Sequence, residues 1–222
     1  MTMAFKGAWT GTSSAADFFG RARDRLRFDE PVGLTDPAII HSRGDHNLDQ
    51  IFKMVADELP VRPAAVLIGI VEREEPTVIL TQRAEHLPDH PGQVSLPGGK
   101  IDPGESPLAC ALREAEEEIG LGRDFIDPIG YLDIYATTKG FRIVPTVARV
   151  RPGFPLAIDR SEVDEVFEVP LAFLMDPANH HRHSRDFRGI TRSFYAMPFA
   201  ERYIWGVTAG ILRTLYERVV AD

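Results

Sequence analysis

The chain has 222 residues, of which 44% are hydrophobic and 26% charged, and this ordinary globular composition excludes wholesale disorder. Its formal net charge of −8 makes the surface a poor partner for nucleic acid or an anionic membrane, so an anionic substrate would have to be met by local cations, either Arg side chains or bound metal. The single cysteine, Cys110, excludes an internal disulfide and fits a reducing compartment. No apolar run approaches the roughly 20 residues of a spanning helix, and the N-terminus does not have the pattern of a secretory leader. We therefore expect a cytoplasmic location.

Residues 1–60 are predicted to form an N-terminal helical extension. Its first helix covers Ala15–Phe28 with Ser14 as the cap, because apolar residues recur there on one stripe. A second helix follows Asn47 and stops before Pro60. The stripe of the first helix consists of Phe18, Phe19, Ala22 and Leu26.

A different pattern begins after residue 60, and we assign residues 61–222 to one α/β domain with a mixed β-sheet sandwiched between helices. Short apolar and β-branched runs predict strands over Ala64–Val71, Thr77–Gln82, Gly130–Ala136, Phe141–Val150 and Glu165–Val169. The segment Phe187–Tyr195 contains Arg188-Gly189, which is typical of a hairpin turn. Apolar residues at helical spacing then predict a closing helix over Tyr203–Val220.

The most informative helix is predicted between Ser106-Pro107, a strong helix start, and Gly120, a natural stop. It carries Glu114, Glu117 and Glu118 at i, i+3 and i+4, on the side opposite its apolar residues. Like charges at this spacing repel by roughly 0.2–0.5 kcal/mol per pair, and a hard divalent cation would turn that repulsion into a binding site. Alone, the three glutamates would indicate only a solvated acidic face.

The residues around this helix follow a more specific pattern. Gly99 is followed after five residues by Glu105, and after seven more by Arg113-Glu114. Glu117-Glu118 and Gly120-Leu121 complete a sequence that resembles the Nudix box at every fixed position, with Ala115 as a mild departure.

That resemblance implies a Nudix fold and an enzyme that hydrolyses a diphosphate with Mg²⁺ or Mn²⁺. It implies that Arg113 pairs with Glu105 and orients the carboxylates. Glu114 and Glu162 are the candidate general bases, with Asp164 and Glu165 as rivals. The implied metal site comprises the carbonyl of Gly99 with Glu105, Glu114, Glu117 and Glu118.

A second motif lies upstream of the box. It reads Ile79-Leu80-Thr81-Gln82-Arg83-Ala84, then Pro88, Gly92 and Leu96-Pro97-Gly98-Gly99 at gaps of three residues. It resembles the extra motif of Nudix coenzyme A pyrophosphatases, from which Ala84, Pro88 and Leu96 depart. The resemblance implies that coenzyme A or acyl-coenzyme A is cleaved into 3′,5′-ADP and 4′-phosphopantetheine or its acylated form.

The implied substrate-binding residues are Arg83, His90, Gly92, Gly98 and Phe141. Arg83 either holds an anionic group or braces the strand edge, and His90 either contacts phosphate or fixes the loop. Phe141 either lines the ligand pocket or packs in the core.

Two other functions stay open on the sequence alone. The first is hydrolysis of another nucleoside diphosphate derivative, such as ADP-ribose or NADH, and the second is a Nudix-fold binding module without turnover. Family habit also makes a homodimer an expectation. A basic cluster in this acidic chain is expected to meet either the 3′-phosphate of the substrate or the acids of a neighbouring subunit; it consists of Arg182, Arg185, Arg188 and Arg192.

Overall fold

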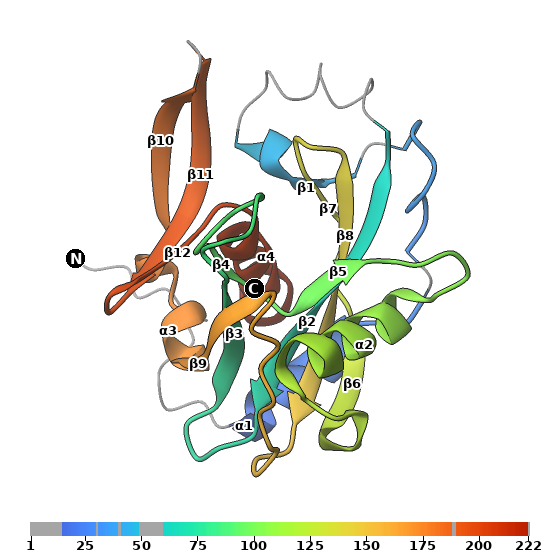
Figure 1. Ribbon diagram of the computed structural model, residues 1–222, viewed down its shortest axis with the longest axis vertical. Helices are drawn as coiled ribbons and strands as arrows, with labels where there is room; N and C mark the ends of the chain where they lie inside the picture. Colours follow the sequence, from blue (N-terminus) through green and yellow to red (C-terminus); the bar gives the residue numbers. More distant parts are fainter. Residues whose placement is uncertain (1–14, 30, 40, 49–59, 188–189, 222) are drawn as a thin grey trace, which may run out of the picture.

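A computed structural model of the protein describes residues 15–29, 31–39, 41–48, 60–187 and 190–221 (Figure 1). The described helices are α1 (Ala15–Arg25), α2 (Pro107–Ile119), α3 (Leu171–Leu174) and α4 (Val207–Leu215), which continues as a π-helical turn (Tyr216–Val220). Short 3₁₀ turns cover Asp45–Asn47, Arg123–Phe125 and Pro177–Asn179.

The larger sheet of the described residues is mixed. Its central pair, β2 and β8, is parallel over ten residue pairs, from Arg62↔Phe141 to Val71↔Val150. The path of strands runs β1-β7-β8-β2-β3-β4, and β5, β6 and β9 add to β2, β8 and β3, respectively. These strands are β1 (Arg43–Gly44), β2 (Arg62–Val71), β3 (Thr77–Arg83), β4 (Val94–Ser95), β5 (Gly98–Lys100), β6 (Ile126–Tyr131), β7 (Tyr135–Ala136), β8 (Phe141–Val150) and β9 (Val163–Pro170).

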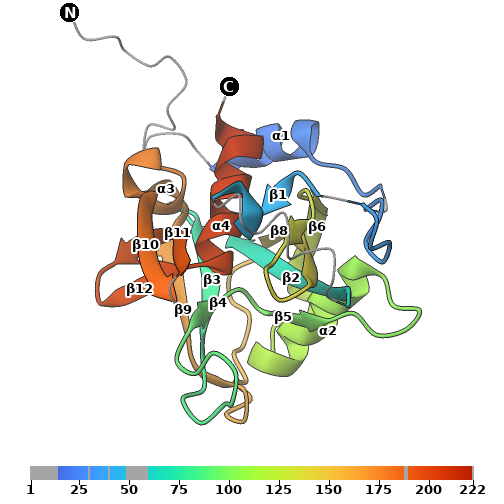
Figure 2. The same cartoon turned by 90° about the horizontal axis from the view of Figure 1, so that it is seen from above.

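Helices cover both faces of this sheet, because side chains alternate along its strands. On β2, Leu67 packs with the buried side of α2, whereas Ile68 and Ile70 pack on the opposite side with α1 and α4. Figure 2 shows α2 on one side of the sheet and α1 and α4 on the other. The predicted mixed sheet between helices is therefore confirmed.

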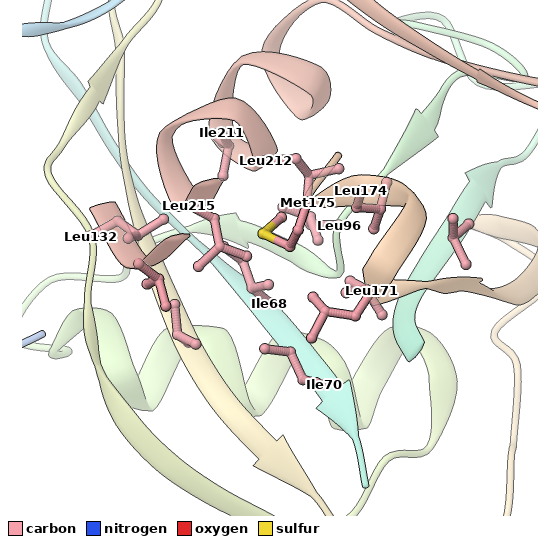
Figure 3. Close-up of a cluster of buried hydrophobic side chains, with 14 of the residues drawn as sticks. Ile68, Ile70, Leu96, Leu132, Leu171, Leu174, Met175, Ile211, Leu212 and Leu215 are labelled. Carbon is pink, nitrogen blue, oxygen red and sulfur yellow. The ribbon is translucent and has the colours of Figure 1, made fainter. Parts of the chain in front are cut away.

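The larger of two buried clusters joins the sheet to the C-terminal part of the chain. It brings together side chains from β2, α3 and α4, and it also receives Phe18, Phe19 and Ala22 of α1. The residues labelled in Figure 3 are Ile68, Ile70, Leu96, Leu132, Leu171, Leu174, Met175, Ile211, Leu212 and Leu215. Helix α1 thus shares its core with the sheet, and the predicted domain boundary near residue 60 stays a prediction.

A second sheet is built from β10 (His181–Phe187), β11 (Ile190–Phe199) and β12 (Arg202–Trp205), all antiparallel. Its first two strands rise from the body of the molecule as a long ribbon (Figure 1). The pairing of Phe187 with Ile190 confirms the predicted hairpin.

Most predicted elements are present, and α2 has both predicted ends. The Ser106 hydroxyl accepts a hydrogen bond from the Ala109 N–H at 3.2 Å, and Gly120 ends the helix with a φ of 70°. Helix α1 ends at Arg25, three residues before its predicted end at Phe28. The second predicted N-terminal helix and the Ser14 cap lie outside the described residues.

Two predicted elements are wrong in their extent. The strand predicted over Gly130–Ala136 is interrupted between β6 and β7, opposite Pro145 of β8, which has no N–H to continue the ladder. The helix predicted over Tyr203–Val220 begins only at Val207, because Arg202–Trp205 pair with β11 and Gly206 turns the chain with a φ of 63°. Within the described residues, no helix is long and apolar enough to cross a membrane.

Candidate active site

Arg113 on α2 donates hydrogen bonds to oxygen atoms of four residues in three segments of the predicted site. Its Nε and Nη2 donate to the two carboxylate oxygens of Glu105, both at 3.0 Å, and Nη2 also donates to the Lys100 carbonyl at 3.2 Å. Its Nη1 donates to Glu114 and Glu117, both at 2.9 Å. The two bonds from Arg113 hold the pKa of Glu105 below its ordinary value. The predicted pairing of Arg113 with Glu105 is confirmed, and it ties the loop before α2 to the helix.

The three glutamates of α2 have different environments. Glu117 is exposed, Glu114 is partly buried, and Glu118 is only 4% exposed. A solvated acidic face is therefore excluded for Glu118, because α2 presents this residue to β5, where it accepts a hydrogen bond from the Gly98 N–H at 3.3 Å.

Glu118 lies at the centre of a group of interacting charges. Burial, followed by the nearby carboxylates of Glu114 and Glu162, raises its pKa to about 8, and the charge of Arg83 opposes this rise. Burial also raises the pKa of Glu114, to which Glu162 contributes, whereas the hydrogen bond from Arg113 lowers it. These mutual effects bring four of the predicted site residues together: Arg83, Glu114, Glu118 and Glu162.

The loop before β9 holds Glu162 in this group. The Glu162 carbonyl accepts a hydrogen bond from the Ala84 N–H at 2.9 Å, directly after Arg83. The rival acids have other partners. Asp164 accepts from the Glu85 N–H at 2.9 Å, and Glu165 forms a two-bond ion pair with Arg202 at 2.5 and 2.7 Å.

The loop between β3 and β4 is closed at its base by backbone bonds between Arg83 and the other end of the loop. Arg83 N–H donates to the Gln93 carbonyl at 3.0 Å, and the Gly92 N–H donates to the Arg83 carbonyl at 3.1 Å. Gly92 has a φ of 62°, and a Cβ there would overlap the Glu85 carboxylate. His90 also has a positive φ, 57°, which is uncommon for a residue other than glycine.

Two further contacts involve the predicted substrate-binding residues His90 and Phe141. The His90 ring Nε2 lies 3.0 Å from the Lys139 ammonium, which bridges the β3–β4 loop to the loop before β8. Phe141 pairs with Arg62 on β2, three residues along that strand from the partner of Gly99, and the Arg62 guanidinium lies 5.5 Å from its ring centre. Phe141 therefore lies at the edge of the site and is not brought into the carboxylate group.

Comparison with known proteins agrees with this geometry. The NUDIX domain family matches residues 60–188, more than half of the chain. The chain belongs to this family. It is a Nudix hydrolase, an enzyme that acts on a diphosphate substrate.

Its relatives include the Nudix hydrolase NudL of Enterobacter sp. (strain 638), 38% identical over 164 residues, covering 73% of this chain and 85% of that protein. NudL of Escherichia coli O7:K1 is 39% identical over 155 residues, covering 69% and 81%. Solved structures with a similar chain path include a MutT protein from Methanosarcina mazei Go1, with 24% identity, 53% and 83% coverage and a TM-score of 0.43. A MutT/nudix family protein from Enterococcus faecalis has 18% identity, 79% and 70% coverage and a TM-score of 0.45.

Nudix enzymes typically use a divalent metal. The chemistry of the donor atoms fits such an ion, because carboxylate oxygens are the ligands that Mg²⁺ and Mn²⁺ prefer, and Glu118 is a buried acid beside two others. Among the described residues, however, no group of three or more His, Cys, Asp or Glu side chains is arranged to hold an ion. The Nη1 of Arg113 engages both Glu114 and Glu117.

Two residues that hold the loop before β8 had no predicted role. The contact of Lys139 with His90 joins two loops that are distant in sequence. Asp45 accepts hydrogen bonds from the Tyr135 hydroxyl and the Thr138 N–H, both at 3.1 Å, and so holds the loop that carries Lys139. No local pattern in the sequence indicates either contact.

Proposed function

We propose that this Nudix hydrolase cleaves the diphosphate of coenzyme A or acyl-coenzyme A in a reaction that depends on Mg²⁺ or Mn²⁺. The products would be 3′,5′-ADP and 4′-phosphopantetheine or its acylated form. The single observation that carries the proposal is the grouping of Arg83, from the coenzyme A-type motif, with Glu114, Glu118 and Glu162. The charge of Arg83, a cation that could meet a phosphate, acts on Glu118 of the box.

The proposed metal ligands are the Gly99 carbonyl, Glu114, Glu117 and Glu118, and Glu105 completes the acidic set while it holds Arg113. When bound, the ion would neutralise the diphosphate oxygens and lower the pKa of an attacking water. Arg113 would keep the carboxylates oriented through its contact with Glu105. The hydrogen bond from the Gly98 N–H would fix the position of the Glu118 carboxylate relative to β5.

Glu162 is the proposed general base, with Glu114 as the alternative. Its charge acts on both Glu114 and Glu118, whereas Asp164 and Glu165 have structural partners. We expect Glu162→Gln to lower kcat by about 10²–10⁴-fold with little change in stability. The matched control is Glu165→Gln, which removes an acid three residues away and should affect stability through Arg202 more than it affects kcat. The reverse order of effects would reject Glu162 as the base.

On the substrate side, Arg83 would hold one phosphate, and the backbone at Gly92 and Gly98 would allow close approach of the diphosphate. His90 would contact a phosphate or keep the loop in place, and Phe141 would line the more distant pantetheine end.

The substrate is tested by comparing kcat/KM for coenzyme A, acetyl-coenzyme A, ADP-ribose and NADH in the presence of Mg²⁺ and of Mn²⁺. Coenzyme A or its thioester should be fastest, and activity should disappear with EDTA and return with added metal. If ADP-ribose or NADH were fastest, the alternative kept open by Ala84, Pro88 and Leu96 would hold instead. Tight binding without metal-dependent product, unchanged by Glu117→Gln, would indicate a binding module.

A further inference from the structure

The sheet formed by β10, β11 and β12 has one face in the core and one face outside it. Met197 and Ile204, which pair with each other, are fully buried in the larger core cluster and mark the inner face. Alternate residues point the other way. The outer face carries His183, Arg185, Arg192, Phe194, Tyr203 and Trp205.

Four of these side chains form a continuous ring surface. His183 stacks on Tyr203 with ring centres 6.2 Å apart, and its Nδ1 lies 2.7 Å from the Tyr203 hydroxyl. Phe194 contacts Trp205 edge to face at 5.3 Å, and Tyr203 lies 6.4 Å from Trp205. Tyr203 is 41% exposed, so part of this surface is open to solvent. Aromatic platforms of this kind stack on nucleobases.

The same face is positively charged in an otherwise acidic chain. Arg185 and Arg192 pair directly across β10 and β11, so both lie beside the rings. The sequences of the three strands contain one carboxylate, Asp186, and it lies on the opposite face, where it accepts a hydrogen bond from Thr191. A guanidinium offers a planar pair of donors that matches a phosphate. The face therefore combines a base-stacking surface with a site for a phosphate.

This face is continuous with the proposed active site through β12. Trp205 is followed by Gly206, and the Gln93 amide lies 3.8 Å from the position that a Cβ on Gly206 would take. The carbonyl of Gln93 accepts the hydrogen bond from the Arg83 N–H. Strand β12 also contacts β4, which begins at Val94 directly after Gln93, so the end of the outer face lies near the base of the loop that starts at Arg83.

From these observations we infer that the outer face of this sheet binds the 3′-phosphoadenosine end of the substrate. The adenine stacks on the ring surface, and Arg185 and Arg192 hold the 3′-phosphate, while the diphosphate lies at Arg83. The inference rests on the proposed coenzyme A activity, since ADP-ribose and NADH have no 3′-phosphate at this position. Charge complementarity favours this ligand over a second copy docked face to face, which would bring the arginines of both copies together.

The test compares KM for coenzyme A with KM for dephospho-coenzyme A, which lacks only the 3′-phosphate. In Arg185→Ala the ratio of KM for coenzyme A to KM for dephospho-coenzyme A should rise about tenfold, the effect of losing one charge-assisted bond to phosphate. Arg182→Ala is the matched control, because it removes the same charge from the same strand but on the inner face, where Arg182 donates to the Leu48 carbonyl. Its ratio should equal that of the wild type. An unchanged ratio of the two KM values in Arg185→Ala would overturn the inference. If that variant also changed the molar mass of the protein in solution, the face would be a subunit interface instead.

Direct binding separates this inference from the proposed activity. Titration with 3′,5′-ADP should quench the fluorescence of Trp205, and 5′-AMP should bind at least tenfold more weakly. Trp205→Phe identifies the signal, because the chain has one other tryptophan, Trp9. If coenzyme A were not cleaved but 3′,5′-ADP bound with this preference and Arg185→Ala removed it, the proposed activity would fail and the binding face would stand. Equal affinity for the two nucleotides would reject the binding face, whatever the activity.

Discussion

The adjacent glycines 98 and 99 allow a sharp test of how the site is built. The three atoms nearest to a Cβ on Gly99 would all belong to the carboxylate of Glu114, with Oε2 at 2.7 Å, and this flexible end can move away. A Cβ on Gly98 would instead meet the backbone of β2, overlapping the Ala65 carbonyl and lying 2.7 Å from the Val66 Cα. Gly98 also has a φ of 156°, which side chains rarely adopt. The two substitutions therefore add the same methyl group with different consequences.

For Gly99→Ala we expect a free energy of unfolding within about 1 kcal/mol of the wild type, because only a side-chain end moves. The displaced Glu114 should weaken Mn²⁺ binding and kcat by about 10–100-fold, the usual effect of disturbing a metal ligand. For Gly98→Ala we expect a loss of about 3 kcal/mol or more, from overlap and backbone strain together.

The assay combines urea unfolding of EDTA-treated protein, Mn²⁺ titration by calorimetry and steady-state kinetics on all three proteins. Comparing unfolding without metal keeps the stability effect separate from the binding effect. The reasoning would be refuted if Gly99→Ala bound Mn²⁺ and turned over substrate like the wild type. It would also fail if the two variants lost equal stability, since the backbone of β2 would then not be the difference between them.

Two other predictions concern ion pairs. Arg113→Lys keeps the charge but loses the two-bond contact with Glu105, so kcat should fall about tenfold or more while KM changes less. Glu105→Gln should have a similar effect on kcat, and steady-state kinetics checks both variants. Glu168 has a pKa lowered by its hydrogen bonds from Arg73 and Thr77, so its stabilising effect exists above the unfolded-state pKa and disappears as pH falls through the folded-state pKa. Glu168→Gln should thus lower the free energy of unfolding by roughly 0.5–1 kcal/mol at pH 7, a value discounted for the exposure of Arg73, and should not change it well below pH 4. An equal loss of unfolding free energy at both pH values in urea unfolding would contradict this.

Local signals determined which parts of the fold the sequence could predict. Helix α2 was predictable because its cap, its first-turn proline and its terminal glycine all lie within the helix and its two neighbours. The assignment of Tyr203–Trp205 to a helix failed because Ile204 fits a helical stripe and a buried strand position equally well, and only the pairing with β11 distinguishes them. Strand β5 was missed for a similar reason, since its two glycines have low strand propensity and pair because β2 is beside them.

The site shows the same division between local and long-range information. The contact of Arg113 with Glu105 could be expected from their positions around one helix. The burial of Glu118 could not, because it depends on Gly98 from a strand that the sequence did not indicate. The approach of Glu162 to the acids of α2 is likewise set by β9 pairing with β3, almost 80 residues away in sequence.

The acids of the site fall into two groups with different electrostatic roles. Glu105 is balanced within the protein, since both of its oxygens accept bonds from Arg113. Glu118 is buried next to Glu114 and Glu162, and the protein offers it a backbone N–H and the more distant charge of Arg83. Burying like charges together is costly, and without a metal the raised pKa of Glu118 relieves this cost by favouring its protonated form; a bound cation would favour the charged form instead. We therefore expect a metal to bind on the side of α2 that faces β5, where Glu118 accepts the bond from the Gly98 N–H, with the pair of Glu105 and Arg113 as its support.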